Sequence, residues 1–189
     1  MKQNILPAIK LSLLLLIVFA VLYPAFIWVA AQAAPNKGKG ELATVNGKVV
    51  GYTNEGQNFT WDKYFWSRPS AVGYNAAGSG GSNKGANNQD YLQVVKDRLD
   101  TFLVHNPTVK KEQVPVELIT ASGSGLDPHI SPEGALVQID RVAKARNISP
   151  GMLRGLIDKQ TEKPLLGMFG PARVNVLQLN IELDKMYNP

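Results

Sequence analysis

The stretch Leu11–Ala34, LSLLLLIVFAVLYPAFIWVAAQAA, decides how this chain is organised. It contains no charged residue, and most of its side chains are large and apolar. As an α-helix it would be about 36 Å long, which is enough to cross a hydrocarbon layer of about 30 Å. We therefore predict that this segment enters a membrane and that the rest of the chain lies outside the hydrocarbon layer.

Two fates are open for the apolar segment. Ala31-Gln32-Ala33, followed by Ala34, has the small-residue pattern of a signal-peptidase site. The apolar run is much longer than the roughly 7–15 residues of a typical signal-peptide core. We therefore favour an uncleaved anchor over a removed signal peptide.

The orientation of the anchor rests on its place in the chain rather than on charge. Lysines stand on both sides of it, at Lys2 and Lys10 before the span and at Lys37 and Lys39 after it. The positive-inside comparison is therefore nearly even. A first apolar segment this close to the N-terminus commonly acts as a signal anchor, so we expect residues 35–189 to lie outside the cytoplasm.

Composition excludes several classes of protein. The 189 residues carry a net charge of +5 and no cysteine, which excludes a disulfide scaffold, a thiol nucleophile, a zinc–thiolate site and an iron–sulfur cluster. The positive excess is spread along the chain instead of forming the dense Lys/Arg stripe of a nucleic-acid-binding surface. We expect a lipid bilayer and acidic or protein partners, and no nucleic acid.

We divide the chain into a tail (residues 1–10), a transmembrane anchor (11–34), a tether (35–42) and one extramembrane domain (43–189). Within the domain, Asn46-Gly47 lies between β-prone residues and predicts a hairpin with a type I′ turn. Residues 72–88 are mostly Gly, Ala, Ser and Asn, which predicts a long loop.

Local signals predict both helices and strands in the rest of the domain. Apolar residues recur at helical spacing from Leu92 to Phe102, and Ser131-Pro132 and Ser149-Pro150 are typical helix starts. Asn147 is suited to end the helix that begins at Pro132. Residues 114–120 are interpreted as a strand. For residues 174–184 alternation favours a strand, although the same residues also fit a helix. The fold class is therefore mixed α+β.

One helix face looks charged and solvent-exposed. On the helix that begins near Pro132, Arg141, Lys144 and Arg146 fall largely opposite the apolar positions. We therefore interpret these three cations as a solvated face.

Motifs for known chemistry are mostly missing from the sequence. It has no Gly-x-x-x-x-Gly-Lys-Ser/Thr phosphate loop and no Gly-x-Ser-x-Gly nucleophile elbow, and its two histidines offer little for a metal. A serine-hydrolase set of Ser122 or Ser124 with Asp127 and His129 is possible. All of these residues lie in one short loop, however, whereas triad partners usually converge from distant segments. We favour a rigid turn.

The segment Ser79-Gly80-Gly81-Ser82-Asn83 is the other candidate site. Successive glycines can point backbone amides into one concavity that holds a phosphate. Ser-Gly-Gly also resembles the signature of ABC-type ATPases, although Ser82 stands where the usual Gln would be. Pattern alone favours a plain loop.

Several longer strings together resemble one family. They are Tyr64–Ala71 (YFWSRPSA), Tyr74-Asn75, Ser79–Asn83 (SGGSN), Thr120–Pro132 (TASGSGLDPHISP), Arg141–Arg146 (RVAKAR) and Gly170–Asn180 (GPARVNVLQLN). On these strings the chain is identified as a member of the C-subunit family of the Kdp potassium-transporting ATPase, a bacterial high-affinity K⁺ uptake pump. The resemblance covers the anchor and nearly the whole domain.

The resemblance implies a non-catalytic accessory subunit in the bacterial inner membrane. Its partners would be the ATP-hydrolysing P-type subunit, the potassium-channel-like subunit and a small membrane subunit. It would act as a catalytic chaperone that raises the ATP affinity of the ATP-hydrolysing subunit. No metal and no covalently bound cofactor is implied, and ATP would be met through the complex. The candidate nucleotide contacts are Ser79, Gly80, Gly81, Ser82 and Asn83.

A second group of residues is predicted to contact partner subunits: Trp66, Arg68, Ser124, Asp127 and His129. A domain outside the cytoplasm cannot meet cytosolic ATP directly. Either the orientation or the nucleotide contact is then wrong, or the chaperone effect passes through the membrane subunits. The alternatives from other classes are a membrane-anchored extracytoplasmic serine hydrolase and an anchored ligand-binding domain.

Overall fold

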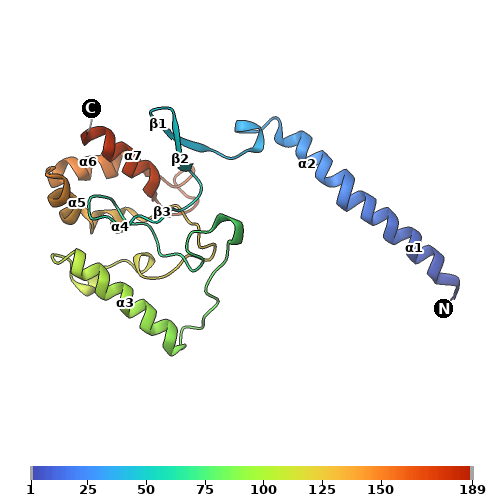
Figure 1. The fold of residues 1–189 in the computed structure, drawn as a ribbon, viewed down its shortest axis with the longest axis horizontal. Helices are drawn as coiled ribbons and strands as arrows, with labels where there is room; N and C mark the ends of the chain where they lie inside the picture. The colour runs from blue at the N-terminus through green and yellow to red at the C-terminus, as the bar shows by residue number, and fades with distance from the viewer. Residues whose placement is uncertain (1, 188–189) are drawn as a thin grey trace. The chain divides into compact units, whose positions relative to one another are not determined.

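The structure, a computed structural model, describes residues 2–187 and divides into two compact units, Met1–Glu41 and Leu42–Pro189 (Figure 1). The first unit is a helical rod and the second is a mixed domain of helices and short strands. The predicted fold class, one apolar N-terminal helix followed by a compact α+β domain, is confirmed.

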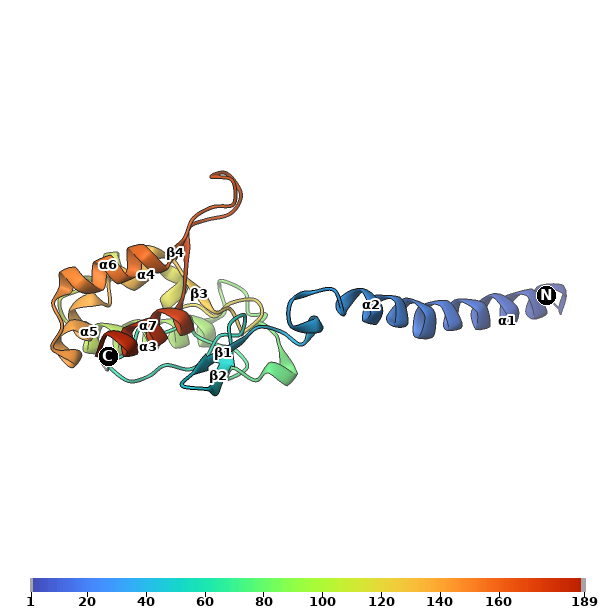
Figure 2. The ribbon, with the colours of Figure 1, turned by 90° about the horizontal axis from the view of Figure 1, so that it is seen from above.

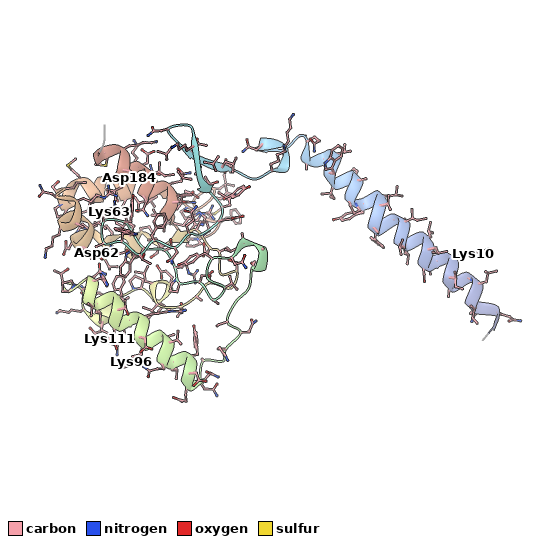
Figure 3. All side chains as sticks on the ribbon, viewed as in Figure 1. Lys10, Asp62, Lys63, Lys96, Lys111 and Asp184 are labelled. Carbon is pink, nitrogen blue, oxygen red and sulfur yellow. The ribbon has the colours of Figure 1, made fainter. Side chains whose placement is uncertain are left out.

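The rod consists of α1 (Lys2–Ile17), a π-helical turn η1 (Val18–Leu22) and α2 (Tyr23–Ala31). The π turn lies just before Pro24, whose ring would otherwise clash with the carbonyl four residues earlier. Residues Gln3–Ala31 are long and apolar enough to cross a membrane, and none of that span is buried inside the protein. Lys10 is drawn near the N-terminal end of the rod, before the uncharged stretch (Figure 3).

The second unit begins with an antiparallel hairpin of β1 (Leu42–Val45) and β2 (Lys48–Tyr52). Asn46 and Gly47 have φ values of 50° and 75°, as a type I′ turn requires. The predicted hairpin is confirmed. A bulge interrupts the pairing between Ala43 and Thr44.

Helices form most of the remaining regular structure. The longer ones are α3 (Gln89–His105), α4 (Pro132–Leu136), α5 (Ile139–Arg146), α6 (Pro150–Gln160) and α7 (Val176–Tyr187), and single 3₁₀ turns are η2 (Pro35–Gly38), η3 (Ala76–Gly78), η4 (Lys111–Gln113) and η5 (Val116–Leu118). Ser131 and Ser149 accept hydrogen bonds from the amides of Gly134 and Met152, so both predicted N-caps are confirmed. Asn147, at φ 55° and ψ 43°, ends α5 as expected. The single helix predicted from Pro132 to Asn147 is wrong, however, because a turn at residues 137–138 divides it into α4 and α5.

A small antiparallel sheet connects distant parts of the domain. Its strands are β3 (His129–Ile130), β5 (Arg173–Asn175) and β4 (Thr161–Glu162), in that order, so that β5 is central. His129 pairs with Asn175, and Thr161 pairs with Val174. The connection from β4 to β5 rises away from the rest of the domain in Figure 2.

Two strand predictions are wrong. Residues 174–184 form only the end of β5 before they enter α7, because the alternating apolar residues are buried on two different helix faces. Leu179 and Leu183 enter the main core, whereas Leu177 and Ile181 pack with Ala43 of the β1–β2 hairpin.

The second error lies in residues 114–120, which contain the 3₁₀ turn η5 instead of a strand. Val114 and Leu118, four residues apart, are both buried in the main core. The Thr120 amide and hydroxyl both donate to the Val116 carbonyl. The turn therefore satisfies the backbone locally, and no neighbouring strand is needed.

Candidate functional site

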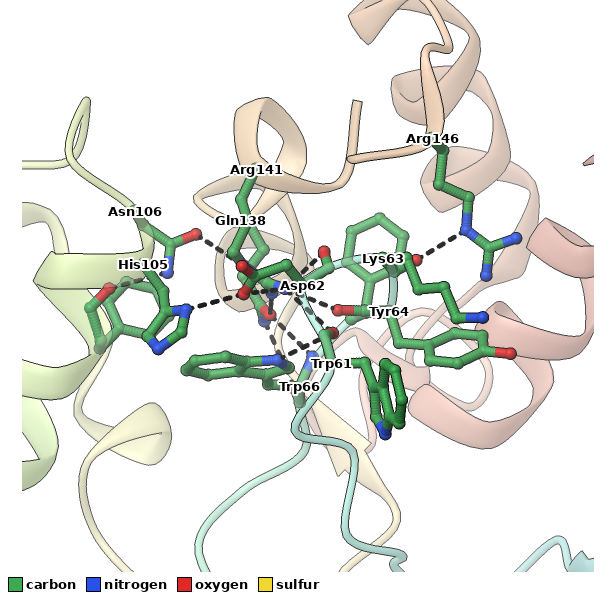
Figure 4. Close-up of polar contacts among 12 residues, drawn as sticks. Trp61, Asp62, Lys63, Tyr64, Trp66, His105, Asn106, Gln138, Arg141 and Arg146 are labelled. Atoms are coloured by element: carbon green, nitrogen blue, oxygen red, sulfur yellow. Dashed lines mark hydrogen bonds and ion pairs between the residues drawn. The ribbon is translucent and has the colours of Figure 1, made fainter. Parts of the chain in front are cut away.

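The segment Trp61–Trp66 crosses the domain without a partner strand, and two arginines of α5 hold it (Figure 4). The Arg141 guanidinium donates to the carbonyls of Asp62 (2.7 Å) and Tyr64 (2.9 Å). It also donates to the side chains of Gln138 and Asn106. Residues 61–64 form a turn that is closed by a hydrogen bond from the Tyr64 amide to the Trp61 carbonyl, and Arg141 supplies donors to the other carbonyls of this turn.

Arg146 holds the same segment one turn further along α5. Its Nε donates to the Lys63 carbonyl at 2.7 Å, and its Nη2 donates to Asp184 on α7 at 2.6 Å. The Tyr64 hydroxyl donates to the other Asp184 oxygen at 3.0 Å. The guanidinium also lies over the Tyr64 ring.

The prediction that Arg141, Lys144 and Arg146 form a solvated face is therefore wrong for two of the three. The side chains of Arg141 and Arg146 are only 3% and 5% exposed, whereas Lys144 is exposed. Burial lowers the pKa of Arg141 to about 10, opposed by the charge of Asp62, so the group stays charged at neutral pH. Both arginines are structural supports.

The supported segment fixes the predicted contact residue Trp66 inside the domain. Its ring meets Arg141 on one face, with Phe102 and His105 edge-on. Its amide donates to the Gln138 side chain at 2.7 Å. Trp66 is therefore partly buried and packs within the domain, whereas Trp61 in the same segment is 70% exposed.

Three of the predicted partner-contact residues form one charged cluster. Arg68 Nη1 lies 2.8 Å from Asp127 Oδ2, and the His129 amide donates to Asp127 Oδ1 at 3.0 Å. Burial by itself would raise the pKa of Asp127, but the hydrogen bonds from His129 and the charge of Arg68 outweigh it and hold that pKa at about 2. The cluster therefore carries a fixed ion pair at neutral pH.

The predicted nucleotide segment packs against the loop that holds Ser124. The Ser79 hydroxyl and the Gly80 amide both donate to the Ser124 carbonyl at 2.9 Å. A Cβ on Gly81 would lie 3.1 Å from the Gly123 carbonyl oxygen, so the two backbones approach closely here. The two segments singled out in the sequence therefore form one loop cluster, although 45 residues separate Ser79 from Ser124.

The two remaining residues of the nucleotide segment lie at its exposed end. Asn83 adopts a left-handed backbone at φ 52°. Ser82 lines a small cavity of about 240 Å³ together with Lys84 and Arg98. The Gly80 amide is already engaged by a carbonyl, so it is not available to an anion in this conformation.

The loop residues do not form a hydrolase triad in the part of the chain that the structure describes. The Ser124 hydroxyl accepts from the Leu126 amide, and the buried Ser122 hydroxyl has no hydrogen-bond partner among the described residues. His129 Nδ1 lies 3.5 Å from Asp127, whose carboxylate also binds Arg68. Across residues 2–187 no group of three or more acidic or histidine side chains is placed to hold a metal ion.

A cavity of about 780 Å³ opens beside the charged cluster. Arg68, Asp127 and His129 line it on one side, and Leu165 and Phe169 from the β4–β5 connection line it as well. Glu117 also lines it and accepts hydrogen bonds from the amide and hydroxyl of Ser131. The candidate site is therefore a polar cavity next to apolar side chains, built from three segments that are distant in sequence.

Sequence reasoning missed two parts of this arrangement. The buried role of Arg141 and Arg146 carries no local signal, because a solvated and a buried arginine look alike in one sequence. The β4–β5 connection did carry a local signal, because Leu165-Leu166-Gly167-Met168-Phe169 is an apolar run around a glycine.

Comparison with known proteins gives a consistent family. A family model described as KdpC, the c chain of the K⁺-transporting ATPase, matches residues 5–185. Relatives named potassium-transporting ATPase KdpC subunit are similar over nearly their whole length. The protein of Flavobacterium psychrophilum is 54% identical over 97% of this chain and 99% of its own. Those of Bacteroides fragilis (50%, covering 98% and 99%) and Geobacter sulfurreducens (48%, covering 94% and 97%) are similar as well.

Proposed function

Because this chain belongs to the KdpC family of K⁺-transporting ATPase c chains, we propose that it is a non-catalytic, membrane-anchored accessory subunit of such a complex. The apolar helix stays attached and lies in the bacterial inner membrane, and residues 35–189 lie outside the cytoplasm. ATP hydrolysis belongs to another, P-type subunit, and K⁺ passes through a channel-like subunit. A small membrane subunit completes the set of partners.

The match to the family over residues 5–185 carries this proposal, since it includes the anchor and the domain together. The cavity beside Arg68, Asp127 and His129 supports a contact role for the domain. Its ion pair is built on loops that pack on one another, so the polar groups are preorganised for a partner.

The chaperone effect belongs to the same proposal. The domain raises the ATP affinity of the ATP-hydrolysing subunit through contacts with the membrane subunits. The engaged Gly80 amide supports this indirect route over a direct contact between ATP and Ser79–Asn83. A photoreactive ATP analogue that labels Ser79–Asn83 in the assembled complex would instead favour direct contact.

Removal of the anchor tests the proposal. The full chain and a variant lacking Leu11–Ala34 are each co-expressed with the other subunits and purified through a tag on this chain. We expect the partners to co-purify with the full chain only, because the anchor helix packs beside their spans. Denaturant unfolding of the shortened chain, monitored by tryptophan fluorescence, serves as the folding control. If the folded, soluble remainder still assembled and supported K⁺ uptake, the anchor would have no architectural role.

A further inference from the structure

The connection between β4 and β5 carries an unusual set of exposed apolar side chains. We call residues 164–171 the apolar hairpin, and Figure 2 shows it rising from the domain beside β4. Leu165, Leu166, Met168 and Phe169 are 69%, 78%, 76% and 60% exposed. Four large apolar side chains within five residues form a contiguous patch at its tip, and such patches commonly mark interaction sites.

The tip is ordered by its own backbone rather than by packing. The amides of Leu165 and Phe169 each donate to the carbonyl of the other residue at 3.0 Å. Leu166 and Gly167 at the turn have φ values of 54° and 74°. A left-handed backbone is costly for leucine and easy for glycine or asparagine. The chain therefore exposes the apolar side chain of Leu166 at a backbone position that would favour asparagine or glycine.

The surroundings of the hairpin favour a protein partner over lipid. At its base Arg173 Nε pairs with Glu162 Oε2 at 2.8 Å, and Asp158 and Lys159 add one charge of each sign. Lys163 is then the one basic residue in excess among these neighbours, so the base of the hairpin carries no polybasic patch of the kind that attracts anionic lipid headgroups. Methionine and phenylalanine are enriched in protein interfaces, and charged residues are depleted at the buried centre of an interface.

The hairpin also adjoins three of the residues that the sequence predicts to contact partner subunits. Leu165 and Phe169 line the same cavity as Arg68, Asp127 and His129. An apolar projection next to polar groups matches the usual anatomy of an interface, with a dry centre and a polar rim. The preformed backbone reduces the ordering cost of docking.

We propose that the apolar hairpin is the main docking element of this domain, and that its tip inserts into an apolar cleft on another subunit of the complex. The inference rests on the proposed function, because it requires a partner subunit. Leu165, Leu166, Met168 and Phe169 together supply the area that is buried on docking, and Arg68 with Asp127 lies at the rim.

The absence of cysteine makes a site-specific test simple. A single cysteine in the full chain, Met168→Cys, is labelled with an environment-sensitive fluorophore. It is then studied in liposomes, alone and in the assembled complex. We expect the complex to protect the label from aqueous iodide by about fivefold or more, with no quenching by spin-labelled lipid. Val104→Cys, on an equally exposed apolar residue of α3, should stay open to iodide throughout.

A functional variant complements the label. The double variant Met168→Ser, Phe169→Ser should retain the unfolding midpoint of the isolated chain, because both side chains are exposed there. Its recovery with the partner subunits should fall by about tenfold or more, as expected for a hot spot, whereas Val104→Ser should leave recovery unchanged.

The outcomes separate the two proposals. If the unaltered chain does not co-purify with partner subunits, the proposed function and this inference both fail. If it does co-purify while the label at residue 168 stays open to iodide, or is quenched by lipid, the subunit role stands and the docking hairpin is wrong. Full recovery of the double variant would likewise contradict the inference.

Discussion

The guanidinium carbon of Arg141 lies 4.4 Å from the ring centroid of Trp66, and the same guanidinium bonds to the backbone carbonyls of Asp62 and Tyr64. A cation from a helix therefore supplies the hydrogen-bond donors for the carbonyls of a turn that has no neighbouring strand. This relationship fixes the segment that leads to Arg68, and so it positions one wall of the candidate site.

Arg141→Met should destabilise the domain by about 3 kcal/mol, because it leaves several buried carbonyls without donors. Arg141→Lys should recover only part of the loss, since an ammonium cannot reproduce the planar fork. Unfolding of the full chain by denaturant, followed through tryptophan fluorescence, measures both. Lys144→Met, on the exposed side of the same helix, is the matched control and should change stability by less than about 0.5 kcal/mol. Equal effects at positions 141 and 144 would contradict the buried network.

The lowered pKa of Asp127 predicts a pH-dependent free energy of unfolding. Its pKa is about 2 in the folded protein and 3.8 as the unperturbed value, so the folded state favours the charged form. The stabilisation is fully present above about pH 4 and is lost as the pH falls from about 4 to 2. Asp127→Asn should therefore cost about 2 kcal/mol at pH 7 and only about 0.4 kcal/mol at pH 2, where half of the folded molecules still carry the charge.

Unfolding free energies at the two pH values test this point. Asp158→Asn, at an exposed carboxylate of α6, serves as the control and should show no comparable pH-dependent difference. A loss of stability in Asp127→Asn that is the same at both pH values would mean that the ion pair with Arg68 is not its source.

Two glycines in one loop make a matched pair for the loop cluster. Gly125 has φ 68°, and a Cβ there would lie 2.6 Å from Val72 Cγ2 and 2.8 Å from the Gly80 carbonyl oxygen. Gly123 has open space around the same position. Gly125→Ala should cost about 2 kcal/mol or more, and Gly123→Ala less than about 0.5 kcal/mol. Similar unfolding midpoints for the two variants would show that residues 79–83 are not packed on this loop.

Orientation is testable with one cysteine. One variant carries Lys84→Cys, on an exposed part of the long loop. The other carries Asn4→Cys, near the N-terminal end of the rod. A membrane-impermeant thiol reagent applied to intact cells should label residue 84 and leave residue 4 unlabelled until the cells are opened. The reverse pattern would place the domain in the cytoplasm and restore a direct route from ATP to Ser79–Asn83.

Local chemistry explains which elements could be predicted from sequence. The Asn46-Gly47 turn, the two Ser-Pro helix starts and the stop at Asn147 depend on the residues themselves, and all are confirmed. The apolar rod is equally local. Such features are visible in one sequence because their hydrogen bonds close within a few residues.

The errors arise where tertiary packing decides. Leu177 and Leu179 alternate as in a strand, yet a helix buries them because two separate clusters lie against α7. Arg141 and Arg146 are buried because the carbonyls of a turn 77 to 83 residues away need hydrogen-bond donors. The candidate site is similar: its residues could be named from motifs, but the cavity exists only because Arg68, Asp127 and the apolar hairpin converge.

The central claim is that this chain acts on a partner subunit and does not itself hydrolyse ATP. The most direct measurement is the ATP dependence of K⁺-stimulated hydrolysis by the complex with and without the full chain, beside the isolated chain. We predict that half-maximal hydrolysis needs less ATP when the chain is present, and that the isolated chain hydrolyses none. Identical ATP curves, or ATP turnover by the isolated chain, would contradict the claim.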